Sequence, residues 1–272
     1  CDGSLMGNGI EARSFKIPTF QLAVPIRHRQ ESVQEYAAEE VVNAIHFIEE
    51  QTGEKFDWDA FFKSMKRFNA ETEEFLEWME ISKTDYPQVM GVTLALYRYG
   101  VYQAAGGRNQ AFLDMDKKLT KMALDAYKSK EMAAKEYRHR AMTWGVQAAY
   151  YTALPIWLLN CWGVVTIADM LSMVSTEMVN TEDKHQAMLD LAYLYENMIM
   201  RNRSNGGYET GVEALWRYCE MFNIDIVIMY VHMGCKSMSG YHGLFEEEAR
   251  KHGVHLIWVT HNLMCPEDGS RR

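Results

Sequence analysis

The stretch that decides the fold reads Ile224-Asp-Ile-Val-Ile-Met-Tyr230, and residues 231–237 continue it as Val-His-Met-Gly-Cys-Lys-Ser. A short run rich in isoleucine and valine is typical of a strand that is buried on both faces. Helical patterns flank this run at about residues 209–222 and 243–252. An apolar strand between two helices is the repeating unit of a parallel sheet with crossover connections.

Similar strands are predicted elsewhere, at residues 17–24, 164–168 and 254–259. Between the first and second of these the patterns are helical, and we expect helices near residues 32–51, from 57 onward, and at 88–104, 108–130 and 132–142. Shorter helices are expected at 4–15, 147–161 and 181–200. The predicted fold class is therefore α/β, with two parallel-sheet units of Rossmann or flavodoxin type and a helical insert. The first unit is expected to be truncated at its N-terminus.

These boundaries predict three parts: residues 1–30 as the end of the first α/β domain, 31–142 as the helical segment, and 143–272 as the second α/β domain. The chain begins with Cys1 instead of a methionine, so we expect it to be a fragment.

The formal net charge of -9 argues against nucleic acid as a partner, because phosphate backbones bind basic surfaces. Residues 141–168 carry no full charge and are long enough to span a membrane. Pro155 and two glycines interrupt them, so a buried helix followed by a buried strand is the preferred interpretation, without a membrane span. The five cysteines are odd in number and widely spaced, and no signal peptide is visible, which favours a reducing cytoplasm.

In open parallel sheets, ligands bind beyond the carboxyl ends of the strands. The residues there are few, and they form the candidate site: Arg27, His28 and Arg29, then Asp169, then His232, Cys235, Lys236 and Ser237, and finally His261. The two arginines can clamp phosphates, although solvated surface charges look the same in a sequence. Each histidine can relay a proton or play a structural part.

Cys235 is the outstanding candidate. Gly234 before it permits the close approach of a bulky group, and the positive charge of Lys236 favours the thiolate that a nucleophile or a metal ligand needs. The alternative is a buried inert thiol at a strand end. Cys1 is a possible second ligand, whereas Cys161 and Cys219 lie in apolar helical patterns and are predicted to be core residues.

Four segments, in this order, resemble subunits of the benzoyl-CoA reductase and 2-hydroxyacyl-CoA dehydratase superfamily. They are Cys1-Asp-Gly-Ser with Ile17-Pro-Thr-Phe, Gln51-Thr-Gly-Glu-Lys-Phe-Asp57, the strand and loop at 224–237, and Gly253-Val-His-Leu-Ile-Trp258. The resemblance covers essentially the whole chain.

The resemblance implies a 4Fe–4S cluster held by three cysteines, with Cys1 and Cys235 at two of the ligand positions and the third upstream of Cys1. It also implies an acyl-CoA substrate, a homologous second subunit, and an ATP-hydrolysing iron–sulfur activator or subunit pair that donates electrons. His232 is then a candidate proton donor, with Lys236 and Ser237 beside it, and Arg27 and Arg29 are candidates for binding the cofactor.

Dehydratases of this superfamily typically continue Cys-Lys-Pro, whereas here Ser237 follows Lys236. This departure favours an ATP-dependent reductase of the benzoyl-CoA type, which adds low-potential electrons and protons to an aromatic acyl-CoA ring. Trp144, Trp157 and Trp162 can line an apolar pocket for that ring or pack in the core. The alternatives are a 2-hydroxyacyl-CoA dehydratase subunit that eliminates water through a ketyl radical, and a non-catalytic partner subunit.

Overall fold

The computed structural model of the 272-residue chain describes residues 2–23, 31–88, 109–131, 136–148, 150–151, 153–171, 177–197 and 208–268. Its centre is a sheet of four strands in the order β2-β1-β3-β4, and every neighbouring pair is parallel. The strands are β1 (His139–Trp144), β2 (Val164–Asp169), β3 (Ile226–His232) and β4 (His255–His261). The prediction of an α/β fold with a parallel sheet is thereby confirmed.

Three of these strands lie where the sequence patterns predict them, but β1 does not. The predicted helix at 132–142 is wrong from residue 139 onward, because His139–Trp144 pairs with β2 on one side and β3 on the other. Ala141 and Met142 are good helix formers, yet both are fully buried in the middle of the sheet. Burial between two strands outweighs a local preference that is worth less than about 1 kcal/mol per residue.

The N-terminal segment also differs from its prediction. The helix expected at 4–15 is present as α1 (Asp2–Phe15), but residues 17–23 form no strand. The side chain of Ile17 is 59% exposed. A strand is stable only beside a partner, and within the described residues none pairs with this segment.

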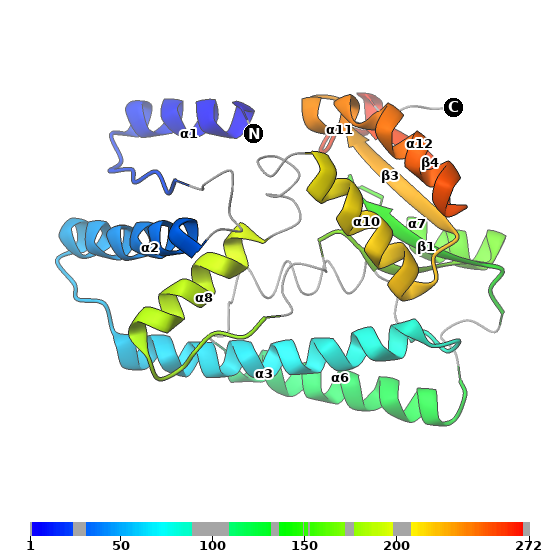
Figure 1. The fold of residues 1–272 in the computed structure, drawn as a ribbon, viewed down its shortest axis with the longest axis horizontal. Helices are drawn as coiled ribbons and strands as arrows, with labels where there is room; N and C mark the ends of the chain where they lie inside the picture. Colours follow the sequence, from blue (N-terminus) through cyan, green and yellow to red (C-terminus); the bar gives the residue numbers. More distant parts are fainter. Residues whose placement is uncertain are drawn as a thin grey trace.

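Helices cover one face of the sheet. Figure 1 shows α10 (Tyr208–Phe222) crossing in front of the strands, with α12 (His242–His252) beside β4. The core between them is formed by alternate residues of the strands, among them Met142, Val227 and Met229, together with Phe245 of α12. This alternation places the neighbouring residues, such as Tyr230, on the opposite face.

The helices that lie away from the sheet form two pairs, and the second pair joins the helical segment to a helix from the later part of the chain. α3 (Trp58–Lys83) packs against α6 (Gln110–Lys128), and α2 (Glu31–Thr52) packs against α8 (Lys184–Glu196), as Figure 1 shows. Inside the first pair, the buried indole N–H of Trp78 donates a hydrogen bond of 3.0 Å to Thr120 Oγ1. In the second pair, the Tyr195 hydroxyl donates to the carbonyl of Ala37 at 3.1 Å. The predicted helix at 88–104 lies outside the described residues apart from its first residue.

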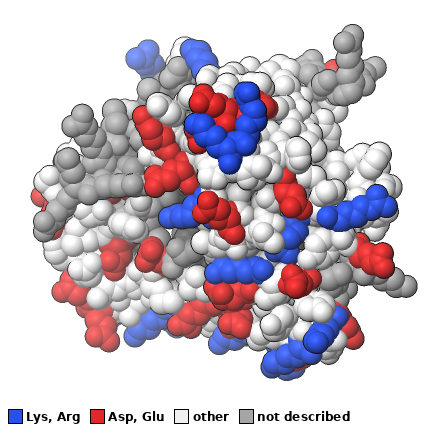
Figure 2. All heavy atoms as spheres, turned by 45° about the vertical axis from the view of Figure 1, so that its right-hand side comes forward, with Lys and Arg blue, Asp and Glu red and all other residues white. Residues whose placement is uncertain are grey.

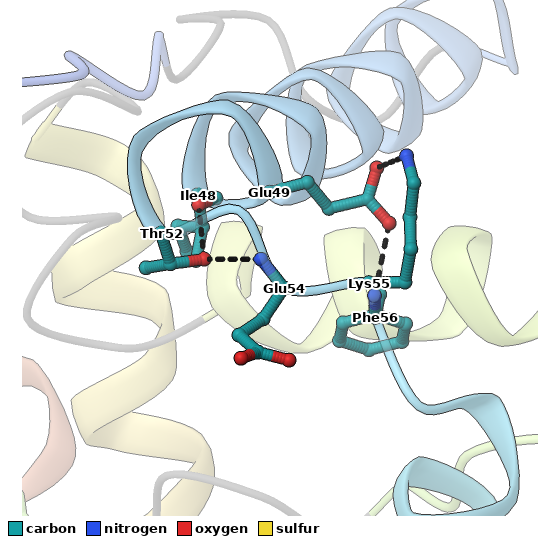
Figure 3. Close-up of polar contacts among 6 residues, drawn as sticks. All are labelled: Ile48, Glu49, Thr52, Glu54, Lys55 and Phe56. Atoms are coloured by element: carbon teal, nitrogen blue, oxygen red, sulfur yellow. Dashed lines mark hydrogen bonds and ion pairs between the residues drawn. The ribbon is translucent and has the colours of Figure 1, made fainter.

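The corner between α2 and α3 is built from the segment 51–57 (Figure 3). Glu49 accepts the backbone N–H of Phe56 at 2.9 Å and the Lys55 ammonium at 3.1 Å. These two donors, the backbone N–H first, hold the pKa of Glu49 below its ordinary value. Gly53 takes a left-handed φ of 74° that ends α2, and Asp57 caps α3 by accepting the N–H of Ala60. The corner therefore sets the direction of α3 through local contacts.

Arg140 of β1 joins the helical segment to the sheet. Its side chain is 6% exposed, and its guanidinium donates to the carbonyls of Phe222, Ser82 and Thr84 at 2.8, 2.6 and 2.9 Å. These carbonyls end α10 and α3, where the helix dipole places partial negative charge. One buried cation thus satisfies the ends of two helices from different parts of the chain.

Residues 147–161 do not form the long helix that their pattern predicts. Among the residues of this stretch that the structure describes, the helical ones belong to α7 (Leu154–Trp157) and to a π-helical turn, η2 (Leu158–Trp162). Trp157 and Trp162 are 49% and 58% exposed, and Cys161 is also exposed, so the prediction of a core position for Cys161 is wrong. Trp144 and Cys219 are core residues as expected. No helix within the described ranges is both long and apolar enough to cross a membrane.

Candidate functional site at the carboxyl edge of the sheet

The loop after β3 is a tight turn that presents Cys235. The backbone N–H of Cys235 donates to the carbonyl of His232 at 2.8 Å, which closes a four-residue turn. The carbonyl of Cys235 in turn accepts the N–H of Ser239, so that Cys235 caps the short helix α11 (Lys236–Gly240). A methyl group at Gly234 would lie 3.0 Å from a ring carbon of His232, which explains why the smallest residue stands there.

Cys235 is a free thiol that is partly exposed to solvent. It is half-buried against the edge of the main core and forms no disulfide. Cys219 lies in the core, and its burial raises the pKa of that thiol to about 12 and keeps it protonated. Cys235 is therefore not fully buried, whereas Cys219 is.

Three candidate residues lie close to Cys235 in the sequence: His232, Lys236 and Ser237. His232 is the last residue of β3, and its Nδ1 accepts the backbone N–H of Gly234 at 3.2 Å. Because Nδ1 is the acceptor, the proton of the neutral ring lies on Nε2. Lys236 and Ser237 are the first two residues of α11, a position where proline is also tolerated, so the helix start itself does not require the serine.

A group of aromatic rings lies beside this turn. His261, at the end of β4, is fully buried, and its ring centroid lies 5.9 Å from that of Tyr230, 6.3 Å from Tyr151 and 6.2 Å from His232. The His261 Nε2 lies 3.0 Å from the carbonyl oxygen of Val146, which can only accept, so this nitrogen carries the proton. Burial and the nearby Tyr151 raise the pKa of Tyr230, which keeps its hydroxyl neutral.

Tyr230 has a role that the sequence patterns did not predict. They treat it as the last residue of a strand, whereas the structure places its ring among those of the site. The signal was available in principle, because Tyr230 lies two residues before His232 on the same strand and so faces the same side.

Of the predicted site residues not yet placed, only Asp169 lies within the described residues. Cys1, Arg27 and Arg29 lie outside the described residues, as does His28. Asp169 is buried at the end of β2, where it accepts the N–H of Leu171 at 2.7 Å and so stabilises a turn. Within the described ranges, no three metal-ligating side chains gather in one place.

The charges on the surface are mixed. Figure 2 shows acidic and basic side chains interspersed over the face drawn, without a continuous basic area. On α12, for example, Lys251 pairs with both Glu247 and Glu248. This face agrees with the net charge of -9 and offers no track for a phosphate backbone.

The fold and the turn together define an α/β protein with a free, half-buried thiol at the carboxyl edge of its sheet, the place where such folds bind ligands. The family model of the 2-hydroxyglutaryl-CoA dehydratase D-component matches residues 1–263, and the chain belongs to this family. A comparison with curated proteins gives no match.

The family match confirms the resemblance to the benzoyl-CoA reductase and 2-hydroxyacyl-CoA dehydratase superfamily. The chain is a subunit of the 2-hydroxyacyl-CoA dehydratase type, and its family indicates an enzyme that acts on an acyl-CoA together with a partner.

Proposed function

We propose that the chain is the cluster-bearing subunit of a 2-hydroxyacyl-CoA dehydratase, with Cys235 as one ligand of a 4Fe–4S cluster. The observation that carries the proposal is the free, half-buried thiol on a tight turn at the carboxyl edge of the sheet, in a chain of this family. Thiolates are the usual ligands of such clusters.

Among the described residues, the thiol of Cys235 suits a cluster ligand. The described residues do not gather the three ligands that the cluster needs. Under this proposal Cys1 supplies a second ligand, and a third cysteine comes from outside these 272 residues. When bound, the cluster supplies a low-potential electron to the thioester carbonyl of the substrate. The electron comes from an ATP-hydrolysing iron–sulfur activator, a homologous subunit completes the site, and the complex works in the cytoplasm.

The residues near Cys235 then have distinct roles. The Nε2–H of His232 is a hydrogen-bond donor, because Nδ1 is occupied by Gly234, and it orients the thioester oxygen or the leaving hydroxyl. Lys236 stabilises the thiolate and the charge that develops on the substrate, and Ser237 adds a short polar contact. Arg27 and Arg29 bind phosphates of the coenzyme A moiety.

The ligand role of Cys235 is tested by iron and sulfide analysis after anaerobic purification of the full chain with its partner subunit. Replacing Cys235 with alanine should remove the cluster, about four irons per complex that carries one. Cys265→Ala is the matched control, because Cys265 is also partly buried and forms no disulfide, and there the iron content should not change. Equal iron content in both variants would refute the ligand role.

A second candidate function is the ATP-dependent reduction of a benzoyl-CoA-type ring, and the feature that favours it is Ser237 where dehydratases have proline. The two reactions differ in electron consumption. Removal of water from a 2-hydroxyacyl-CoA returns its electron, so substoichiometric reductant supports many turnovers, whereas ring reduction consumes electrons with every product. Measuring product formed for each electron supplied, with each substrate in turn, separates the two functions.

A further inference from the structure

The side chain of His261 connects two strands that are not neighbours. His261 lies on β4, and its Nε2 binds the carbonyl of Val146 in the loop after β1 at 3.0 Å. In the sheet β3 lies between these strands, and adjacent strands are about 4.8 Å apart, so β1 and β4 are roughly 10 Å apart. The contact therefore passes over the carboxyl end of β3, where the ring meets Tyr230 and His232.

The loop after β1 is bent onto the end of β3 by Gly145. This glycine has a φ of 100°, and a methyl group on it would lie 2.1 Å from the carbonyl oxygen of Tyr230. Only a residue without a side chain permits this approach. The loop and the His261 ring thus form a bridge across the strand that leads to Cys235.

The backbone of His261 holds the other side of the same turn. Its carbonyl accepts the N–H of Met233 at 3.0 Å, and the next hydrogen bond, from Cys235 N–H to the His232 carbonyl, closes the turn at 2.8 Å. One residue therefore fixes both the strand end and the first residue of the loop that carries the thiol.

If the side chain at position 261 served packing alone, a histidine would lower the stability of the fold compared with an apolar ring. His261 is fully buried, and within the described part of the chain its Nδ1 has no hydrogen-bond partner. A buried acceptor without a donor lowers stability, and phenylalanine would fill the space between the rings without that loss. The hydrogen bond to Val146 is the feature that phenylalanine cannot provide.

We propose that His261 is a positioning residue for Cys235: its bridge to Val146 holds the turn at residues 232–235 in place. The inference rests on the proposed function only in taking Cys235 to be a cluster ligand. The bridge is expected to restrict the Cys235 thiol whether or not a cluster is bound. Its effect on the thiol can therefore be tested on protein without iron.

The test measures the rate at which iodoacetamide alkylates Cys235 in the metal-free full chain, by mass spectrometry of the peptide that contains it. Cys265 in the same molecule is the internal reference. His261→Phe removes the donor and keeps the ring, whereas His261→Gln keeps an N–H donor. The matched control is His255→Phe, the same substitution at the exposed start of the same strand.

Loss of the bridge should free the turn and raise the Cys235 rate relative to Cys265 by about fivefold in His261→Phe, the factor expected for one hydrogen bond. His261→Gln and His255→Phe should stay within about twofold of the parent protein. An unchanged ratio in folded His261→Phe would overturn the proposal.

Hydrogen exchange of the unsubstituted chain provides a measurement that does not depend on how the variants fold. The Met233 amide should be protected to a similar degree as the amides inside β3, and exchange as fast as in an open loop would overturn the proposal. The iron analysis of Cys235→Ala is separate, so the bridge can be present while the ligand role fails, or the reverse.

Discussion

Replacing Arg140 with methionine should separate the helical segment from the sheet. Methionine fills most of the buried volume but donates none of the hydrogen bonds that the guanidinium makes to the carbonyls of Phe222, Ser82 and Thr84. The ends of α3 and α10 would then lose their shared cation.

The magnitude follows from the number and burial of these bonds. A hydrogen bond from a charged group contributes about 1.5–3 kcal/mol, and breaking a buried charged network costs about 3–5 kcal/mol. The three bonds share one guanidinium, so we expect the free energy of unfolding to fall by about 4 kcal/mol. For a chain of this size each kcal/mol lowers the midpoint of thermal unfolding by roughly 2–4 °C, which predicts a drop of about 8–16 °C.

Thermal unfolding followed by circular dichroism measures this drop. Arg140→Lys should lose about half as much, because an ammonium keeps the charge but cannot reach all three carbonyls in a fixed fork. The matched control is Arg138→Met, two residues earlier and exposed, which should change stability by no more than about 0.5 kcal/mol. A fall of less than about 2 °C in folded Arg140→Met would refute the reasoning, because it would mean that water replaces the guanidinium at no cost.

Three further substitutions have defined outcomes. Gly145→Ala places a methyl group 2.1 Å from the Tyr230 carbonyl at a φ of 100°, and should lower the free energy of unfolding by about 2–4 kcal/mol in a urea titration. Thr120→Val removes the acceptor of the buried Trp78 indole N–H and should cost about 1–3 kcal/mol by the same titration, whereas Thr120→Ser should be close to neutral. Glu49→Gln should destabilise the protein at neutral pH, with a loss that disappears in acid, as urea titrations at several pH values would record.

The sign of the last prediction follows from the lowered pKa of Glu49. A carboxyl with a lowered folded-state pKa contributes stability above its ordinary pKa, and that contribution is lost as the pH falls through the folded-state value. A difference between the two proteins that grows in acid would contradict it. For the glycine, Gly240→Ala is the control, since a methyl group there meets nothing within 4 Å. For the threonine, equal losses in the valine and serine variants would show that the hydroxyl is not the cause.

Local sequence patterns are enough to predict the class of the fold and the place of Cys235 after β3. Strands β2, β3 and β4 were predictable because each is a short apolar run between helical patterns, and such runs are stable only inside a sheet covered by helices. Cys235 was predictable because it follows a buried strand at the edge where parallel sheets bind ligands.

The set of residues that lie together at the site depends instead on how the strands pack. β1 was not predictable, because Ala141 and Met142 favour a helix until two neighbouring strands bury them. The bridge from His261 to Val146 joins residues 115 positions apart, across a strand that lies between them in the sheet. No local pattern records such a contact, because it depends on the order of the strands, which the packing of the whole sheet selects.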